Sequence, residues 1–465
     1  MKKDTIAAIS TGMTNSGIGI VRISGEEAFD IIDKIYKGKK QPSTVESHTI
    51  HYGFIVDEEH TVDEVLVSVL HAPRTFTGEN TVEINCHGGT YVVKKVLETV
   101  IKYGARPAEP GEFTKRAFLN GKMDLSQAEA VIDVIQAQSE YALQSSVSQL
   151  QGSVKHKIQA IREKILYHTA FIETALDDPE HISVDGYGDT LYQAVEEVLE
   201  EIKLLIRSSD DGRILKEGIQ TVIVGKPNAG KSSLLNVLSG HDRAIVTDIA
   251  GTTRDILEEQ IQLQGLSLNI IDTAGIRETE DIIERMGVER AKEYANKADL
   301  VIWVIDASCP FDESDEEILE LISDKKSVIL LNKIDLNVMT SKEYLLCKLN
   351  SLSDNSNELE IPIIEISVKE ERGISELEEV IQHMFFEGEI SFNDEVYITN
   401  IRQKAALQAA EESLVRVMES IENQMPEDFY SIDLMDAYES LGNITGETIG
   451  EDLVNEIFSK FCMGK

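Results

Sequence analysis

Residues 225–232 have the types and spacing of a loop that holds nucleotide phosphates. They fit the pattern G-x-x-x-x-G-K-[ST], whose backbone N–H groups surround the phosphates. In such a loop the lysine, here Lys231, reaches the β- and γ-phosphates, and the hydroxyl, here Ser232, binds Mg²⁺. An apolar run at 221–224 precedes the loop, and a helical pattern at 233–238 follows it. We therefore expect a strand, a phosphate loop and a helix whose N-terminus faces the phosphates.

A second polar motif, Asn332, Lys333 and Asp335, follows the apolar run 328–331. We expect it at the carboxyl end of a strand, where α/β sheets bind their ligands. The carboxylate of Asp335 can accept hydrogen bonds from guanine N1–H and the 2-amino group, whereas adenine offers an acceptor at N1 and no 2-amino group. Ser367, after the apolar run 363–366, completes the base pocket. The pattern favours GTP over ATP.

A third motif, residues 272–275, lies between these two. We expect Asp272 to hold the Mg²⁺ shell and Gly275 to lie near the γ-phosphate. The next residue is Ile276, where Ras-like GTPases use a glutamine to orient the attacking water. Because isoleucine cannot do this, another residue must orient the water, or hydrolysis needs outside help. Spacing alone does not choose among four loop carboxylates: Glu278, Glu280, Asp281 and Glu284.

Length and composition are those of a globular chain with about three domains. The sequence has 465 residues, of which 42% are hydrophobic. It has neither the apolar core of a signal peptide nor a run of about 18 apolar residues. Its four cysteines form no C-x-x-C pair, which predicts reduced thiols and neither a disulfide framework nor a zinc site. We expect a cytoplasmic protein without a membrane partner.

The charge is strongly negative and unevenly distributed. The chain has 44 Lys and Arg against 83 Asp and Glu, a net charge of −39. Residues 1–120 have 14 basic and 16 acidic residues, a net of −2, whereas the remainder has 30 and 67, a net of −37. Most of this acidic charge is explained by solubility. A polyanion partner is expected to approach the first domain or a local patch.

Strand and helix patterns mix in residues 1–120. Strands are predicted at 17–25, 65–70 and 81–86, and helices at 26–36 and 89–103. The tetrapeptide Cys86-His87-Gly88-Gly89 has two interpretations. A tight turn between strand and helix is favoured, because an oxyanion-hole loop would need a nucleophile elbow, G-x-S-x-G, which the chain lacks.

Helical periodicity takes over from about Asp124. Ser126 and Glu129 predict a capping box. The polar run 208–212 predicts a boundary, and helical patterns resume at 402–421 and 447–461. One helical domain built from both flanks of an inserted nucleotide-binding domain is the economical interpretation. Two apolar stripes predict helix-packing faces: Ile158, Ile161, Ile165 and Ile172, and then Leu191, Val195, Val198, Leu199, Ile202 and Leu205.

Over essentially its whole length the chain resembles the MnmE (TrmE) family of tRNA modification GTPases. The resemblance rests on the phosphate loop with Asn228, on residues 76–79 and 111–122, on 272–277 and on the C-terminal residues 461–465. Met463 replaces the isoleucine that is usual in the family's tail and keeps its apolar character. The resemblance also includes the run Thr247, Asp248, Ile249, Ala250, Gly251, Thr252, Thr253, Arg254 and Asp255.

The resemblance implies two cations at the phosphates. Potassium would be bound by Asn228, Thr247, Ile249 and Thr252, and would stabilise charge that develops at the β–γ bridge. Magnesium would be bound by Ser232 and Thr253. The family's water-orienting carboxylate corresponds to Glu284. The residues implied to bind GTP are Asn228, Ala229, Gly230, Lys231, Ser232, Ser233, Thr247, Asp248, Ile249, Ala250, Gly251, Thr252, Thr253, Asp272, Thr273, Ala274, Gly275, Asn332, Lys333, Asp335 and Ser367.

The resemblance further implies a site for 5-formyl- or 5,10-methylene-tetrahydrofolate in the first domain. Its contacts would be Arg22, Glu83, Lys122 and Lys465, and Cys462 beside it is implicated in the chemistry. From its surroundings alone, Cys462 is better interpreted as a buried thiol packed beside phenylalanines. A prenylation signal would not fit the final glycine and lysine.

Members of the family form homodimers through the first domain. They also join the FAD-dependent protein MnmG (GidA) in a heterotetramer, and together the two proteins add a carboxymethylaminomethyl or aminomethyl group at C5 of the wobble uridine of certain tRNAs. The alternative is a ribosome-assembly GTPase that only switches its binding to RNA. A single set of GTPase motifs and no KH-type G-x-x-G loop disfavour it.

The predicted fold class is multidomain α/β plus α. Residues 1–120 form an α+β folate-binding and dimerisation domain, and 121–214 the first part of a helical domain. Residues 215–382 form an inserted Ras-like, doubly wound P-loop G domain, and 383–465 the second helical part with its Cys-Met-Gly-Lys tail.

Overall fold

The computed structural model divides into two compact units. The first contains Met1–Gln136, Ser146–Ile202 and Ala405–Lys465, and the second contains Ala137–Ser145 and Lys203–Lys404. The residues that the structure describes are 4–178, 180–181, 186–241, 259–263, 265–271, 295–323, 325–352, 361–385, 398–448, 451–459, 461 and 464.

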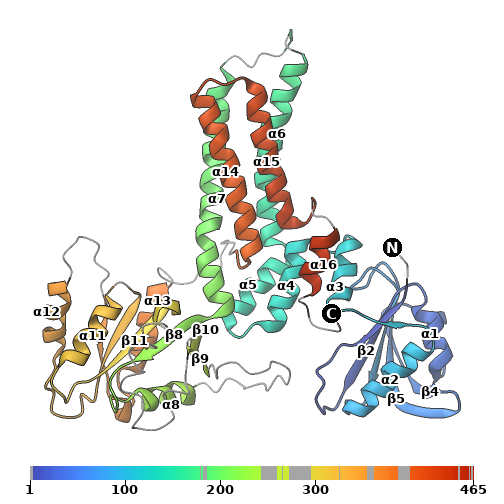
Figure 1. Cartoon of the computed structure of the whole chain (residues 1–465). Helices are drawn as coiled ribbons and strands as arrows, with labels where there is room; N and C mark the ends of the chain where they lie inside the picture. Colours follow the sequence, from blue (N-terminus) through green and yellow to red (C-terminus); the bar gives the residue numbers. More distant parts are fainter. Residues whose placement is uncertain are drawn as a thin grey trace. The chain divides into compact units, whose positions relative to one another are not determined.

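A seven-stranded sheet forms the N-terminal part of the first unit (Figure 1). Its spatial order is β3-β4-β5-β6-β2-β1-β7, and the pairs are antiparallel except for the β1–β7 pair. The predicted strands are confirmed, and the sheet has further ones. The bounds are β1 Ile6–Ile9, β2 Gly19–Ser24, β3 Tyr36–Gly38, β4 Thr49–Asp57, β5 His60–Leu70, β6 Thr81–Cys86 and β7 Arg106–Pro107.

Two amphipathic helices, α1 (Ala28–Ile35) and α2 (Thr90–Lys102), bury their apolar stripes in one core with the sheet. Both match predicted helices. The turn before α2 is tight: a Cβ on Gly88 would lie 2.3 Å from the Ser16 hydroxyl, so glycine is required for close approach. This agrees with the interpretation of residues 86–89 as a turn.

Helices make up the rest of the first unit. In Figure 1, α6, α7, α14 and α15 run side by side as a bundle. Both predicted apolar stripes are buried in it. Helix α15 was not predicted, although its buried residues recur at helical spacing. The bounds are α3 Glu112–Leu119, α4 Leu125–Gln136, α5 Glu140–Leu150, α6 Ser153–Asp177, α7 Tyr187–Glu217, α14 Ile401–Glu422, α15 Glu427–Thr445 and α16 Glu451–Ser459.

One detail predicted for these helices is wrong. The N-terminus of α4 is capped by Asp124, whose carboxylate accepts from the Gln127 N–H at 3.0 Å while the Gln127 side chain accepts from the Asp124 N–H at 3.1 Å. Ser126 and Glu129 therefore lie inside the helix. The polar run 208–212 is helical, within α7, and the domain boundary predicted there stays a prediction. A Cβ on Gly212 would lie 2.3 Å from the Ile398 carbonyl oxygen, so this glycine permits close packing and does not mark a linker.

The second unit contains a six-stranded sheet in the order β13-β12-β11-β8-β10-β9. All its pairs are parallel except β9–β10, and separate apolar cores lie on its two faces. This is a doubly wound α/β sheet. Its strands are β8 Ile219–Val224, β9 Glu259–Leu263, β10 Leu266–Ile270, β11 Leu300–Asp306, β12 Ser327–Asn332 and β13 Ile363–Glu365. Its helices are α8 Lys231–His241, α11 Glu313–Ile322, α12 Lys342–Leu352 and α13 Ile374–Phe385.

The predicted fold class is confirmed, and the second unit interrupts the first along the chain. The four predicted domain boundaries stay predictions.

Candidate nucleotide site

The phosphate loop connects β8 to α8, as predicted, and its glycines are required by close contacts. A Cβ on Gly225, whose φ is +142°, would lie 2.2 Å from the Val304 carbonyl oxygen. A Cβ on Gly230, whose φ is +106°, would lie 2.2 Å from the Asn332 amide nitrogen. Any side chain at either position would displace the loop from neighbouring strands.

Lys231 is the first residue of α8 and closes the loop on itself. Its ammonium group donates to the carbonyl oxygens of Gly225 and Lys226, both at 2.7 Å. Burial lowers the pKa of Lys231. The lysine and the N–H groups of the first turn of α8 therefore concentrate positive potential in the loop, as an anion site requires.

The side chain of Lys226 anchors the loop to the start of α11. Its ammonium lies 2.6 Å from the Asp315 carboxylate and 2.7 Å from that of Asp312. Burial acts to lower the pKa of Lys226, but the hydrogen bonds that its ammonium donates to these two carboxylates outweigh burial and raise the pKa. Asp315 also accepts from the Asp312 N–H, which completes a capping box. Sequence reasoning missed this ion pair. The only hint in the sequence is that a lysine occupies the first unspecified position of the G-x-x-x-x-G-K-[ST] pattern.

Asn332 joins the phosphate loop to the loop predicted to hold the base. Its amide nitrogen donates to the Ala229 carbonyl at 2.8 Å, and its amide oxygen accepts from the Val368 N–H at 3.1 Å. The side chain is buried, so both hydrogen bonds are shielded from water. The Asn332 side chain therefore links two loops that come from distant parts of the sequence.

Asp335 and Lys333 are oriented by neighbours in the same region. The Ser367 hydroxyl donates to one Asp335 oxygen at 2.8 Å, which fixes the plane of an otherwise exposed carboxylate. The Lys333 ammonium lies 2.5 Å from Asp306, at the end of β11. A carboxylate held in this way presents its second oxygen as a directed acceptor, as guanine recognition needs.

The predicted nucleotide site is only partly within the described residues. The structure describes Asn228, Ala229, Gly230, Lys231, Ser232, Ser233, Asn332, Lys333, Asp335 and Ser367. The other predicted nucleotide, cation and water-orienting residues lie outside the described residues: Thr247, Asp248, Ile249, Ala250, Gly251, Thr252, Thr253, Asp272, Thr273, Ala274, Gly275 and Glu284.

The predicted folate residues divide between two positions of the first unit. Arg22 and Glu83 are directly opposite each other on β2 and β6, with Arg22 Nε 2.9 Å from Glu83 Oε1. The Arg22 guanidinium lies 5.7 Å from the centre of the Phe76 ring. Lys122 donates to the Pro73 carbonyl at 3.0 Å, so it contacts the same loop as Arg22 at another point.

The C-terminal tail lies against the N-terminal sheet of the first unit. Phe458 and Phe461 are buried, and a Cβ on Gly111 would lie 2.6 Å from the Phe458 carbonyl oxygen. Further along, the Ser10 hydroxyl donates to the Gly464 carbonyl at 3.1 Å. Cys462 and Lys465 lie outside the described residues. Sequence reasoning missed Ser10, because no local pattern relates residues so far apart in the chain.

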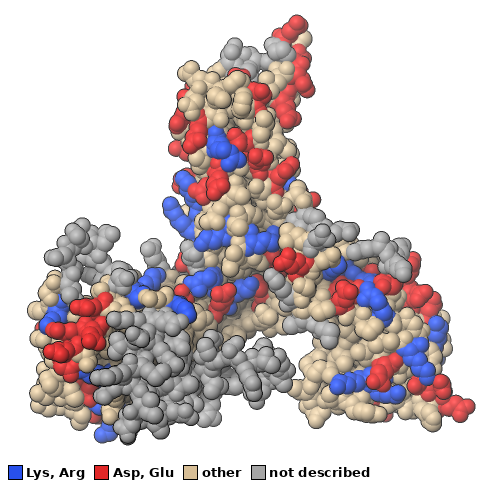
Figure 2. All heavy atoms as spheres, viewed as in Figure 1, with Lys and Arg blue, Asp and Glu red and all other residues tan. Residues whose placement is uncertain are grey.

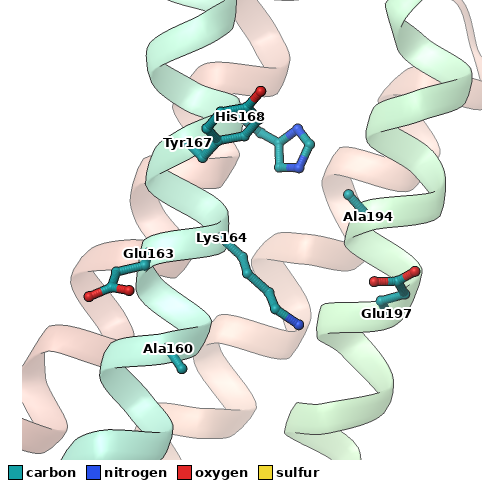
Figure 3. Close-up of a pocket in the computed structure, with 7 residues that line it drawn as sticks. All are labelled: Ala160, Glu163, Lys164, Tyr167, His168, Ala194 and Glu197. Atoms are coloured by element: carbon teal, nitrogen blue, oxygen red, sulfur yellow. The ribbon is translucent and has the colours of Figure 1, made fainter.

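A surface pocket between α6 and α7 contains none of the predicted site residues (Figure 3). Two of its polar groups have protein partners: Lys164 with Glu201 at 2.6 Å, and His168 with the Tyr187 hydroxyl at 2.7 Å. Burial lowers the pKa of His168. The pocket is therefore lined largely by groups that stabilise the bundle.

Comparison with known proteins identifies the family. Residues 125–462 match the MnmE helical domain, and residues 5–122 match the family described as GTP-binding protein TrmE N-terminus. Proteins named tRNA modification GTPase MnmE from Lachnoclostridium phytofermentans and Acetivibrio thermocellus are 58% and 51% identical, and each match covers 100% of both chains. The chain belongs to the MnmE family of tRNA modification GTPases. The resemblance and the prediction of a GTP hydrolase are confirmed.

Solved structures match smaller parts of this MnmE family member. Era of Aquifex aeolicus bound to GDP.AlF4- is 30% identical, the match covers 42% of this chain and 66% of that chain, and the TM-score is 0.27. The G domain of the T. maritima FeoB iron transporter is 28% identical over 36% of this chain and 98% of that chain, with a TM-score of 0.24. Such low scores add nothing to the family assignment. Among the described residues, no helix is long and apolar enough to cross a membrane.

Proposed function

We propose that this protein hydrolyses GTP to drive modification of the wobble uridine in tRNA, together with an FAD-dependent partner of the MnmG (GidA) type. The product would carry a carboxymethylaminomethyl or aminomethyl group at C5, built from a tetrahydrofolate one-carbon unit. The observation that carries the proposal is the full-length family match. The phosphate loop, the guanine-reading Asp335 and the tail against the N-terminal sheet support it.

In this proposal the protein's own residues bind and orient GTP. The Lys231 ammonium, which now bonds two loop carbonyls, exchanges them for the β- and γ-phosphate oxygens. The oriented Asp335 carboxylate accepts hydrogen bonds from guanine. Asn332 holds the phosphate loop at a fixed distance from the loop that binds the base. The other proposed GTP contacts are Ala229, Gly230, Ser233, Asp248, Ala250, Gly251, Asp272, Thr273, Ala274, Gly275, Lys333 and Ser367.

The cation ligands proposed for this site are oxygen donors, as K⁺ and Mg²⁺ require. Asn228 has a left-handed φ of +60° and an exposed side chain, and no hydrogen bond engages its amide within the described part of the chain. Asn228 therefore suits a potassium site shared with Thr247, Ile249 and Thr252, where the ion would stabilise developing phosphate charge. Ser232 in the first turn of α8 and Thr253 would hold Mg²⁺.

Glu284 is the proposed water-orienting carboxylate, because Ile276 cannot take that role. A group of this kind acts mainly in the transition state, so its loss lowers kcat more than it weakens GTP binding. Glu284 lies outside the described residues, and its role rests on the family correspondence.

The folate site is proposed around Arg22, Glu83, Lys122 and Lys465, with Cys462 acting in the modification chemistry. Two contacts support it. The Arg22 guanidinium lies 5.7 Å from the centre of the Phe76 ring and 5.6 Å from that of the Phe113 ring, a cationic and aromatic setting that suits a flat, anionic, conjugated ligand. The bond between Ser10 and Gly464 brings the tail to the end of β1, whose residue Ala8 pairs with Arg22.

A homodimer through the first domain and a cytoplasmic location complete the proposal. The face of the sheet opposite α1 and α2 exposes four apolar side chains on β4 and β5: Ile50 at 65%, Tyr52 at 56%, Phe54 at 37% and Leu66 at 47%. A contiguous apolar group of this kind is typical of an interface, and a second copy of the chain is its proposed occupant.

Hydrolysis measured in KCl and NaCl at equal ionic strength tests the GTPase part of the proposal. We expect strong stimulation by K⁺ alone. Glu284→Ala should lower kcat about 10²–10⁴-fold with nearly unchanged GTP affinity. Equal rates in the two salts would contradict the potassium site, and parallel loss of GTP binding would give Glu284 a structural role instead.

Cys462→Ser tests the tRNA part. In a strain that depends on this protein, the variant should lose the wobble-uridine modification while the purified protein keeps its K⁺-stimulated hydrolysis and its thermal stability. Cys347→Ser, which changes an exposed thiol elsewhere, is the control. Normal modification in the Cys462→Ser strain would show that this cysteine has only a packing role.

A further inference from the structure

Three exposed lysines, Lys37, Lys39 and Lys40, occupy the end of β3 and the turn after it. Strand β3 is the edge of the seven-stranded sheet, and Lys37 on it lies opposite Phe54, at the rim of the apolar face proposed for the homodimer. None of the three ammonium groups lies in an ion pair or hydrogen bond with the described residues. We call them the edge lysines.

Unpaired lysines are unexpected in so acidic a protein. The chain has 83 acidic side chains for 44 basic ones. Elsewhere in the same domain, Lys95 and Lys102 on α2 lie beside Asp57, and Lys102 also binds Glu58. In contrast, residues 34–56 contain four lysines and one carboxylate, Glu46, although Asp33 precedes this stretch and Asp57, Glu58 and Glu59 follow it. The edge lysines therefore differ from the other lysines of the domain in having no ion-pair partner among the described residues. Figure 2 shows how blue and red side chains intermingle over much of the visible surface.

The strand that carries the edge lysines is held in place by Tyr36. Its hydroxyl donates to the Tyr52 carbonyl on β4 at 2.7 Å. Its ring lies across two glycines: a Cβ on Gly38 would be 2.1 Å from the ring hydroxyl, and one on Gly53 would be 2.4 Å from a ring carbon. A side chain at either glycine would displace the Tyr36 ring. The packing of β3 on β4 therefore depends on these two glycines and on Tyr36.

The far end of the lysine segment is fixed as well. The Ser43 N–H donates to the Asp33 carboxylate at 3.2 Å, and the Ser43 hydroxyl donates to the other oxygen of the same group. This interaction also occupies the acidic side chain nearest in sequence on α1. The edge lysines are therefore displayed on a fixed backbone.

Lysines also protect sheet edges against pairing with another strand. Charged residues, and lysine above all, serve that purpose, whereas a polyanion specifically requires positive charge. An RNA backbone presents regularly spaced phosphates that lysines contact as point charges. The combination of three uncompensated lysines and a fixed edge fits a polyanion better than simple protection.

We propose that the edge lysines contact the phosphate backbone of the tRNA substrate. The inference rests on the proposed function and specifies the surface that tRNA uses. These contacts are independent of tRNA sequence, so they contribute to affinity and salt dependence and not to the choice of tRNA.

The test measures the affinity of the full-length protein for unfractionated tRNA between 50 and 200 mM KCl, a range suited to phosphate contacts. Two triple variants change all three edge lysines, one to glutamine and one to glutamate. The control changes Lys94, Lys95 and Lys102 on α2 to glutamine, which removes the same charge from the same domain. Circular dichroism and thermal unfolding of each variant report on the fold, and GTP hydrolysis, whose site lies in the second unit, should equal that of the wild type.

For the glutamine variant we expect the slope of log affinity against log salt to become about three units shallower, one for each phosphate that a lysine no longer neutralises. The glutamate variant should bind more weakly still, and the control should keep the wild-type slope. A wild-type slope in both edge variants would overturn the inference and leave the lysines as edge protection. Equal weakening in the edge and control variants would also overturn it, since it would reflect net charge alone. Failure of the wild-type protein to bind tRNA would overturn the proposed function itself.

Discussion

At the scale of single residues, the nucleotide site depends on side chains that connect distant loops. Asn332 bonds the phosphate loop and the base loop simultaneously, and Lys226 attaches the phosphate loop to α11. The side chain of Lys226 points away from the loop interior, whereas its backbone carbonyl oxygen points inward and accepts a hydrogen bond from the Lys231 ammonium. Lys226 is therefore a positioning residue, and its effect on GTP should be indirect.

Lys226→Met should weaken GTP binding about tenfold, because it removes charge-assisted hydrogen bonds and leaves the buried Asp315 without its partner. Lys226→Arg should restore most of the affinity. A fluorescent GTP analogue measures both, and kcat at saturation should change much less than the affinity. Lys348→Met, which breaks an exposed pair with Glu316, is the control. Unchanged affinity in Lys226→Met would show that the loop holds its shape unaided.

At the scale of elements, the C-terminal tail is attached by backbone proximity more than by side chains. Gly464 has a φ of +94°, and a Cβ there would lie 2.1 Å from the Ile9 carbonyl oxygen. Gly111 also allows a close approach beside α16, where a Cβ would lie 2.6 Å from the Phe458 carbonyl oxygen. Glycines on both partners therefore permit the tail to reach the sheet.

Gly464→Ala should detach the tail, since alanine disfavours this φ and its methyl group collides with β1. We expect faster cleavage of the C-terminus by carboxypeptidase and about tenfold weaker binding of tetrahydrofolate, with GTP hydrolysis unaffected. Gly17→Ala, where no atom lies within 4 Å of the new methyl group, is the control. Equal protease sensitivity in both variants would contradict this account.

At the scale of the whole molecule, the acidic charge makes internal ion pairs important for the fold. Arg106 and Arg116 bind Asp4 and Glu112, and this cluster joins the start of the chain to β7 and α3. Hydrogen bonds from Arg106 lower the pKa of Asp4. Burial acts to raise the pKa of Glu112, but hydrogen bonds from Arg106, the Glu109 N–H and Arg116 outweigh it and lower the pKa.

A depressed carboxyl pKa stabilises the fold above the pKa of the unfolded chain, about 4, and this contribution is lost as pH falls through the folded pKa. Glu112→Gln should therefore cost on the order of 1–3 kcal/mol of unfolding free energy at pH 7 and much less near pH 3. Urea unfolding followed by circular dichroism measures the difference. Glu98→Gln, at a site whose side chain is 68% exposed, should show little change at either pH. A constant difference between wild type and Glu112→Gln across this range would contradict the ionic account.

The sequence by itself determined the fold class, the phosphate loop and the base-reading motif, because these depend on residues close together in the chain. Apolar periodicity placed the strands around Ile84 and Ile223 and the helical stripe at Ile158, since burial of one face follows from spacing alone. Family resemblance, and not periodicity, supplied the cation, folate and water-orienting roles. Those roles remain proposals.

Only the tertiary structure decided which residues meet across long separations. It replaced the predicted capping pair by Asp124 and Gln127, because several polar residues near a helix start satisfy the same pattern and geometry selects one. It also placed Gly212 inside α7, where its missing side chain makes room for the Ile398 carbonyl. A glycine needed for packing and a glycine that ends a helix look identical in sequence, since the difference lies in a neighbour that is remote along the chain.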